Sequence, residues 1–245
     1  MFVPVLRIPG MSLMPADPAA WTLLLHGETQ LTEAAVALEL FLQNPKGKQT
    51  KEQWRARVEN SRQVREAAAH IAGLPDDRWA LRRSDADIPI AAWEAAWASA
   101  APPMGTERRP AFIFARSFVF AIDGIARVLM QLENRPGVAQ TLADFRAALP
   151  HLKGVRDSAH HDDQRIQGLD RKGNAITPGG LHGVVQPGVA VIMSGLVNDA
   201  LTYTTEDGTQ GQVRVCVDTL KVAQAAMQRA LDAFTWHGPA RISPS

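Results

Sequence analysis

The chain has 245 residues, which is enough for one large domain or two small ones with a buried core. Lys and Arg number 26 and Asp and Glu 25, and the resulting formal charge of +1 argues against a surface built throughout to hold nucleic acid. A local basic patch stays open. The only cysteine, Cys216, excludes an internal disulfide and suits a reducing cytoplasm, so we expect a cytoplasmic protein.

The N-terminal part of the chain changes from irregular to helical patterning. Residues 1–30 are rich in proline and predict an irregular segment, apart from a short apolar piece at 21–25. Trp93 and Trp97 share one helical face, and at that spacing we expect them in the core rather than in a ligand platform. Apolar residues at helical spacing predict helices over 31–43, 51–72 and 89–99.

The next helix, expected over 110–134, is apolar almost all round, which is typical of a central buried element. Three charged residues interrupt it: Arg116, Asp123 and Arg127 fall near one line of the helix. A membrane span would rarely tolerate three such charges, so we expect a buried helix and no membrane contact. The charged line is either a solvated stripe or the wall of a polar pocket.

A further helical pattern covers 141–168, with a kink expected at its proline. When its apolar seam is continued, Arg156 and Asp163 occupy positions that the pattern reserves for core. Buried charges are costly unless they are paired. We therefore expect Arg156 to pair with Asp123, and Asp163 to pair with one of the two arginines on the preceding helix, as a buried polar layer between two helices.

The C-terminal part is rich in glycine and proline and then turns to β-type patterning. Asp218 is expected to cap a closing helix. The strands are expected at 189–193, 196–204 and 212–217, the last two joined by a turn at 205–208. The sequence thus predicts a mainly α protein: a helical bundle with a small C-terminal antiparallel β element and a closing helix. Its expected segments are an irregular 1–30, a bundle over 31–168, and 169–245 with the loop, strands and last helix.

Polar chemistry concentrates in residues 145–172, which hold three of the seven histidines. Arg156 and His160 are four residues apart and share a helix face, whereas His161 points elsewhere unless the helix loosens there. A guanidinium beside an imidazole suits phosphodiester cleavage without metal, because the imidazole transfers a proton while the arginine neutralises the phosphate. Histidine titrates near neutrality, as that role requires.

The segment 156–161, RDSAHH, lies in a late helix of a predicted bundle and resembles the motif of the HEPN superfamily: an arginine, a polar residue, and a histidine a few positions on. His161 gives the four-residue gap that is common in the family's RNases, and His160 gives a gap of three. The resemblance covers 31–168. It implies an RNA-binding domain, a metal-independent ribonuclease with Arg156 and His161 as catalytic residues, and a homodimer that brings two motifs together.

Further residues are assigned to this site from the charge pattern. Asp123 is a candidate acidic partner of the catalytic pair, inferred from its place in the charged line. Five basic residues are expected to hold the substrate's phosphate backbone: Arg116, Arg127, Arg165, Arg171 and Lys172.

Two other interpretations stay open. In the first, the polar layer is structural, a buried ion-pair network in a non-enzymatic module that dimerises or binds another protein. In the second, a metal site uses Asp157 with His161, or His160 with Asp163, but such a site needs three or four ligands. The chain offers no second His or Cys cluster at ligand spacing, so we expect neither a metal nor another cofactor.

Overall fold

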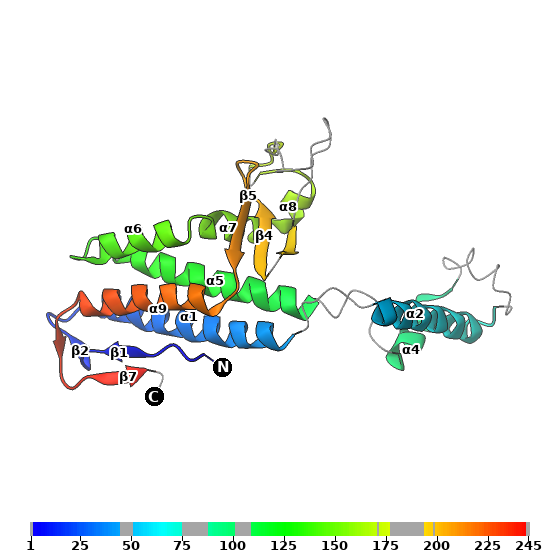
Figure 1. Cartoon of the computed structure of the whole chain (residues 1–245), viewed down its shortest axis with the longest axis horizontal. Coiled ribbons are helices and arrows are strands. Elements are labelled where there is room, and N and C mark those ends of the chain that lie inside the picture. Colours follow the sequence, from blue (N-terminus) through cyan, green and yellow to red (C-terminus); the bar gives the residue numbers. More distant parts are fainter. Residues whose placement is uncertain are drawn as a thin grey trace. The chain divides into compact units, whose positions relative to one another are not determined.

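The structure is a computed structural model that describes residues 2–44, 51–74, 88–100, 109–170, 172–176, 194–197 and 199–243. These residues are mainly α-helical with small antiparallel sheets, which confirms the predicted fold class. The chain divides into two compact units. The larger unit joins Met1–Asn44 to Ala111–Ser245, and the smaller unit is Pro45–Pro110 (Figure 1).

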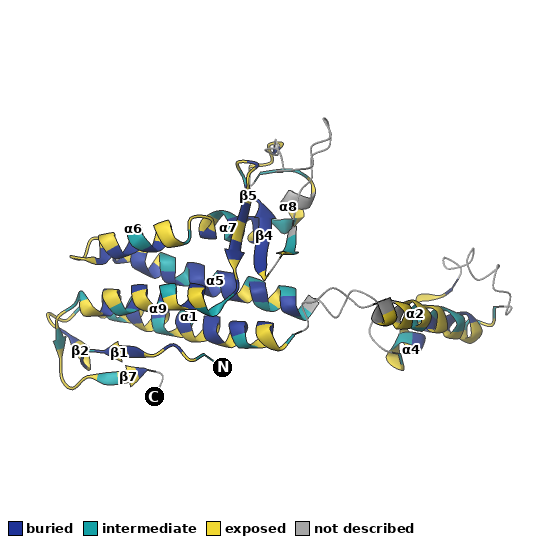
Figure 2. Cartoon of the chain, viewed as in Figure 1, coloured by how far each residue is buried: buried dark blue, intermediate teal, exposed yellow. Residues whose placement is uncertain are grey.

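The larger unit is built around a core of long helices. Helix α5 is buried over much of its length (Figure 2). Its Phe118, Ile122 and Ile125 are fully inaccessible to solvent. Helix α9 packs against both α1 and α6. The bounds of these helices are α1 (Pro18–Gln43), α5 (Arg109–Gln131), α6 (Val138–Ala148) and α9 (Val217–Asp232).

Helix α1 begins at Pro18, so the prediction of irregular chain up to residue 30 is wrong beyond Asp17. The side chain of Asp17 caps the helix by accepting a hydrogen bond of 2.9 Å from the backbone N–H of Ala20. Proline at the first helical position supplies a backbone angle that already suits a helix. Pro18 therefore marks the start of a helix within the segment that was expected to be irregular.

Two short antiparallel pairs join the ends of the larger unit. Strand β1 (Leu6–Ile8) pairs with β7 (Arg241–Ser243), and β2 (Ser12–Leu13) pairs with β6 (Trp236–His237). The side chain of Gln228 on α9 fastens this layer by bonding the backbone N–H and carbonyl of Arg7 at 2.8 and 2.9 Å.

The helix expected over 141–168 is divided into three. Helix α6 ends at Ala148, α7 spans Leu152–His160 and α8 spans Asp162–Ile166. The expected kink at the proline is thus a full break, and His161 has already left helical geometry, with φ −106° and ψ 40°. The apolar seam consequently stops at the end of α7.

A three-stranded antiparallel sheet of order β3-β4-β5 covers α7. Gly211 on β5 allows the close approach, because a Cβ there would lie 3.1 Å from Val155 Cγ2 on α7. The turn after β4 lies where it was predicted, at residues 205–208. The strands are β3 (Ser194–Val197), β4 (Ala200–Thr204) and β5 (Gln210–Arg214).

Two details of the C-terminal prediction differ from the structure, and a third falls outside the described residues. The strand expected over 196–204 is a hairpin that reverses at Asp199, whose φ is +62°. Helix α9 begins one residue before Asp218, and Cys216 takes the cap position without a side-chain cap bond. The strand expected at 189–193 lies outside the described residues.

The smaller unit pairs helix α2 (Lys51–Ile71) with helix α4 (Ile90–Ala98), close to the predicted bounds. Its core holds Val64, Ala68 and Ala96, among others. Trp93 and Trp97 are half-buried and pack against this core, which confirms that they belong to it.

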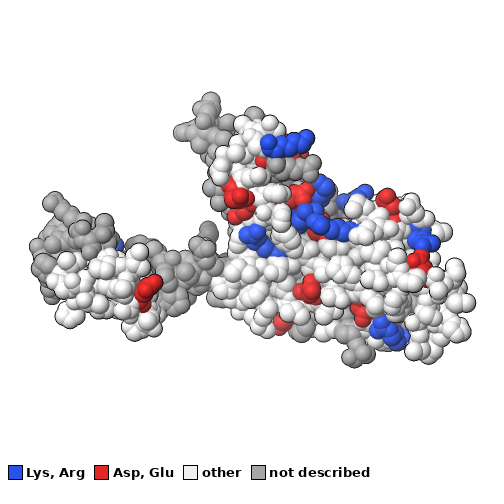
Figure 3. Space-filling view, turned by 180° about the vertical axis from the view of Figure 1, so that it is seen from behind, with Lys and Arg blue, Asp and Glu red and all other residues white. Residues whose placement is uncertain are grey.

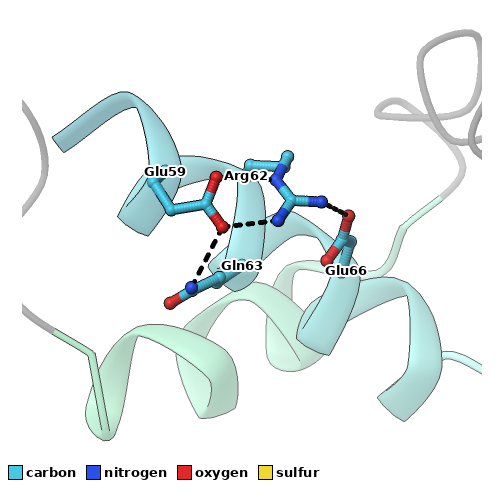
Figure 4. A network of polar contacts seen from close by, with 4 residues as sticks. All are labelled: Glu59, Arg62, Gln63 and Glu66. Atoms are coloured by element: carbon cyan, nitrogen blue, oxygen red, sulfur yellow. Dashed lines mark hydrogen bonds and ion pairs between the residues drawn. The ribbon is translucent and has the colours of Figure 1, made fainter. Parts of the chain in front are cut away.

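The outer surface of α2 carries a network of polar contacts (Figure 4). Arg62 bonds Glu59 in the preceding turn and Glu66 in the following turn, the latter at 2.8 Å, and Gln63 also donates to Glu59. The Glu59 carboxylate raises the pKa of Arg62, with Glu66 adding to the effect. Such exposed pairs support the helix locally.

Candidate functional site

The predicted pair between Asp123 and Arg156 is confirmed. Arg156 Nε on α7 lies 2.9 Å from Asp123 Oδ2 on α5. Asp123 is buried, with 5% of its surface exposed, and the same oxygen accepts a hydrogen bond of 2.8 Å from Arg127 Nε. One buried carboxylate thus balances two guanidinium groups between two helices.

The pairing expected for Asp163 is wrong. Asp163 is exposed on α8, and the two arginines proposed as its partners bond elsewhere. Arg127 bonds Asp123, and Arg116 donates to the backbone carbonyl of Ala159. The physical reason is the end of α7 at His160, which turns the following residues away from the seam.

The ion-pair network continues along α7. Arg156 Nη1 lies 2.7 Å from Asp157 Oδ1, and Lys153 Nζ lies 2.9 Å from Asp157 Oδ2. The Arg156 side chain is 17% exposed, so most of it is withdrawn from water. Its Nε is close to Asp123 but is not aligned for a hydrogen bond, so charge attraction rather than hydrogen bonding holds this contact.

A pocket of about 470 Å³ lies beside this network, between α5, α6 and α7. Its volume falls in the range of about 300–1,000 Å³ that is usual for small-ligand sites. In Figure 3, blue and red side chains lie next to one another on this unit. Four cations and one carboxylate line the pocket: Arg127, Arg146, Lys153, Arg156 and Asp123. Its apolar lining is Ala126, Met130, Phe145, Leu149, Pro150 and Leu152.

The two histidines lie at the other end of α7. His160 is exposed, and its ring centroid lies 6.3 Å from that of Phe120 and 4.9 Å from that of His161. Phe120 and Asp123 are three residues apart on α5, so His160 and Arg156 both face α5 from one side of α7. No contact between described residues joins Arg156 directly to either histidine.

A second, shallower hollow of about 340 Å³ lies near the histidines and is lined by Ile113, Arg116, Ser117 and Phe120. The Arg116 guanidinium lies 5.9 Å from the centroid of the Phe112 ring. Arg116 is therefore held at the histidine end of the seam, by the Ala159 carbonyl and an aromatic ring.

Of the other predicted basic residues that the structure describes, Arg116 and Lys172 do not line the pocket. Lys172 is exposed, and its backbone N–H donates to Asp170 Oδ1 at 2.8 Å. Arg171 and the side chain of Arg165 lie outside the described residues.

Sequence reasoning missed Arg146 and Lys153, which line the pocket with Arg127 and Arg156. For Lys153 a signal was present, because it stands one helical turn before Arg156 and so shares its face. Arg146 has no such signal, since it belongs to a different helix and meets the others only through the break between α6 and α7.

Tyr203 on β4 is fully buried, and its hydroxyl has no hydrogen-bond partner among the described residues. The pKa of Tyr203 is raised to about 12, mainly by burial and also by the Asp162 carboxylate, with Arg116 partly opposing both. The phenol is consequently neutral at physiological pH and a poor candidate for proton transfer there.

No group of three or more His, Cys, Asp or Glu residues in the described part of the chain is placed to hold a metal ion. Across the described ranges, no helix is both long enough and apolar enough to traverse a bilayer. The chain matches no family model, no curated protein and no solved structure.

Proposed function

We propose that the larger unit is a HEPN-like domain that binds RNA at the pocket between α5, α6 and α7. The observation that carries the proposal is the lining of this pocket, where four cationic side chains face one carboxylate. Phosphate groups bind where Arg and Lys side chains converge, and arginine offers a planar fork that fits phosphate oxygens. In this proposal Arg156 and Arg127 hold the backbone, and Asp123 orients both guanidinium groups.

Metal-independent cleavage is the finer part of the proposal. Arg156 and His160 stand one turn apart on α7, about 6 Å along the helix axis. In the proposed step, His160 or His161 accepts the proton of the ribose 2′-hydroxyl as its oxygen attacks phosphorus, and Arg156 balances the charge of the phosphate. A proton returned to the departing 5′-oxygen completes the cleavage. Two copies of the chain would bring two such motifs together.

RNA binding is tested by fluorescence anisotropy with labelled single-stranded RNA at several salt concentrations. Arg127→Ala and Lys153→Ala should weaken binding and lower the slope of log affinity against log salt by about 0.7 for each phosphate that is no longer neutralised. Arg241→Ala is the matched control, because it removes one positive charge from a part-buried pair with Glu28 on the same unit, outside the pocket lining. Equal affinities for all four proteins would refute RNA binding at this pocket.

Cleavage is tested separately by incubating the purified protein with mixed RNA, with and without EDTA. The proposal expects decay that survives chelation and is lost in an Arg156→Ala/His160→Ala/His161→Ala variant. Equal decay with the wild type and the variant would refute the nuclease assignment, and loss of decay on chelation would point to a metal.

The burial of Arg156 favours a second candidate function, a non-enzymatic module that dimerises or binds a protein partner. With 17% of the side chain exposed, Arg156 is placed to lock α5 against α7 as well as to meet a ligand. This candidate predicts that substitutions around Asp123 lower stability while Arg127→Ala and Lys153→Ala leave RNA affinity unchanged.

A further inference from the structure

We infer that the pocket between α5, α6 and α7 seats a nucleobase against its apolar interior while the rim cations hold the attached phosphate. The inference rests on the proposed RNA binding and narrows its substrate class to unstacked nucleotides, which means single-stranded RNA. It follows from the way in which apolar and charged groups are divided over the pocket lining.

The interior of the pocket is apolar and firmly packed. Phe145 and Leu152 back the pocket from the main core of the larger unit, with 1% and 4% of their surface exposed. The apolar surface open to a ligand belongs to Met130, which is 45% exposed, and to the half-buried Ala126 and Leu149. A phosphate placed against these side chains would lose its hydration without compensation. A flat, largely apolar ring fits there instead.

The cations of the pocket differ in how far they are exposed. Arg156 is mostly buried, whereas the side chains of Arg127 and Lys153 are 52% and 76% exposed. Arg146 is also exposed. Arg127 and Lys153 each pair with a largely buried carboxylate, Asp123 and Asp157, and both expose enough of their length to reach a phosphate at the mouth. The phosphate therefore stays at the mouth while the ring enters.

A base inside a duplex cannot enter such a pocket without being unpaired and unstacked. Single-stranded RNA presents its bases freely, and proteins that read it place those bases against apolar or aromatic side chains. The apolar interior of the pocket therefore favours single strands, whose bases are free to enter it. The cations at its rim favour nucleic acid, because they bind phosphate.

The test titrates the intact chain calorimetrically with AMP and with ribose 5-phosphate, which carries the same phosphate and sugar but no base. AMP should bind about tenfold more tightly, as expected for one base transferred onto protein side chains. Ala126→Trp, which fills the pocket from α5, should reduce AMP affinity to that of ribose 5-phosphate. Ala147→Trp, at an exposed position of α6 outside the pocket lining, is the matched control.

Equal affinity of the wild-type chain for AMP and ribose 5-phosphate would overturn the inference, and this comparison needs no variant to fold. Equal affinity for a single strand and for its duplex would overturn it as well. Both results would leave the proposed RNA binding intact if Arg127→Ala and Lys153→Ala still weaken it. Conversely, RNA affinity unchanged by those two substitutions would refute the proposed function whatever the AMP titration gives.

Discussion

Asp123→Asn removes the negative charge that Arg127 and Arg156 share while keeping the shape of the side chain. Both guanidinium groups contact Asp123 Oδ2, at 2.8 and 2.9 Å. Arg127 is half in water and will be hydrated when the charge is removed. Arg156 is 17% exposed and keeps one carboxylate, that of Asp157 at 2.7 Å. The loss of stability should therefore come mainly from Arg156.

Removing one partner of a buried ion pair costs about 3–5 kcal/mol, and the remaining pair with Asp157 places this case at about 3 kcal/mol. With an m value of about 2 kcal/mol/M, the urea midpoint should fall by about 1.5 M. Urea denaturation followed by circular dichroism measures this shift in the transition of the larger unit.

Asp144→Asn is the matched control for Asp123→Asn. Asp144 also lies 2.7 Å from an arginine, Arg229, but both side chains are largely exposed. Exposed pairs contribute little, so the urea midpoint should barely move. If Asp123→Asn lowers the midpoint no more than Asp144→Asn does, the buried Arg156 is not the source of the cost.

A double substitution tests whether the cost of Asp123→Asn comes from leaving the buried Arg156 charge without its partner. Asp123→Leu/Arg156→Met replaces both charges with apolar side chains, so it should be more stable than Asp123→Asn, because no buried charge is left unpaired. A double variant less stable than the single one would show that the pair holds α5 and α7 together by more than charge balance.

Three further substitutions, at positions outside the pocket, give predictions about stability. Tyr203→Phe should leave the chain as stable or about 1 kcal/mol more stable in urea, since it removes a buried hydroxyl that has no partner among the described residues. The raised pKa of Tyr203 should make wild-type stability fall by about 3 kcal/mol between pH 10.0 and about 12, because the unfolded chain releases the phenolic proton first, and Tyr203→Phe should abolish that loss. Gly27→Ala should destabilise by about 1–3 kcal/mol in the same assay, because its Cβ would overlap Met227 on α9 in the core. Asp207→Ala should weaken the β4–β5 turn. Hydrogen bonds from the Thr205 and then the Thr209 hydroxyl lower the pKa of Asp207, so the wild-type advantage over Asp207→Ala should be present above pH 3.8 and vanish as the pH falls through the depressed value.

Each of these predictions has an opposite outcome. A destabilised Tyr203→Phe chain would mean that the hydroxyl has a partner after all, and an unchanged high-pH slope would mean that Tyr203 does not set it. Gly124→Ala is the control for Gly27→Ala, since its Cβ would meet only the side chain of Gln30, which can rotate away. An acid sensitivity that survives in Asp207→Ala would assign it to another carboxylate.

The sequence by itself determined the fold class, the approximate bounds of α2, α4 and α5, and the Asp123–Arg156 pair. These features depend on local rules. Helical periodicity can be recognised from residues that are close in the sequence. A charge at a core position needs a partner, because burying it alone is costly. The start of α1 was also readable, because Asp17 followed by proline is a capping signal.

Only the tertiary structure decided which residues meet across the molecule. Leu6 pairs with Ser243, and nothing near either residue in the sequence specifies that partner. Asp163 is exposed because α7 ends at His160. The basic pocket forms because α6 and α7 diverge at their break, which brings Arg146 near Lys153 and Arg156. Periodicity describes one helix at a time. The angle between two helices is set by packing against the rest of the core, and a pocket formed between them is therefore absent from any local pattern.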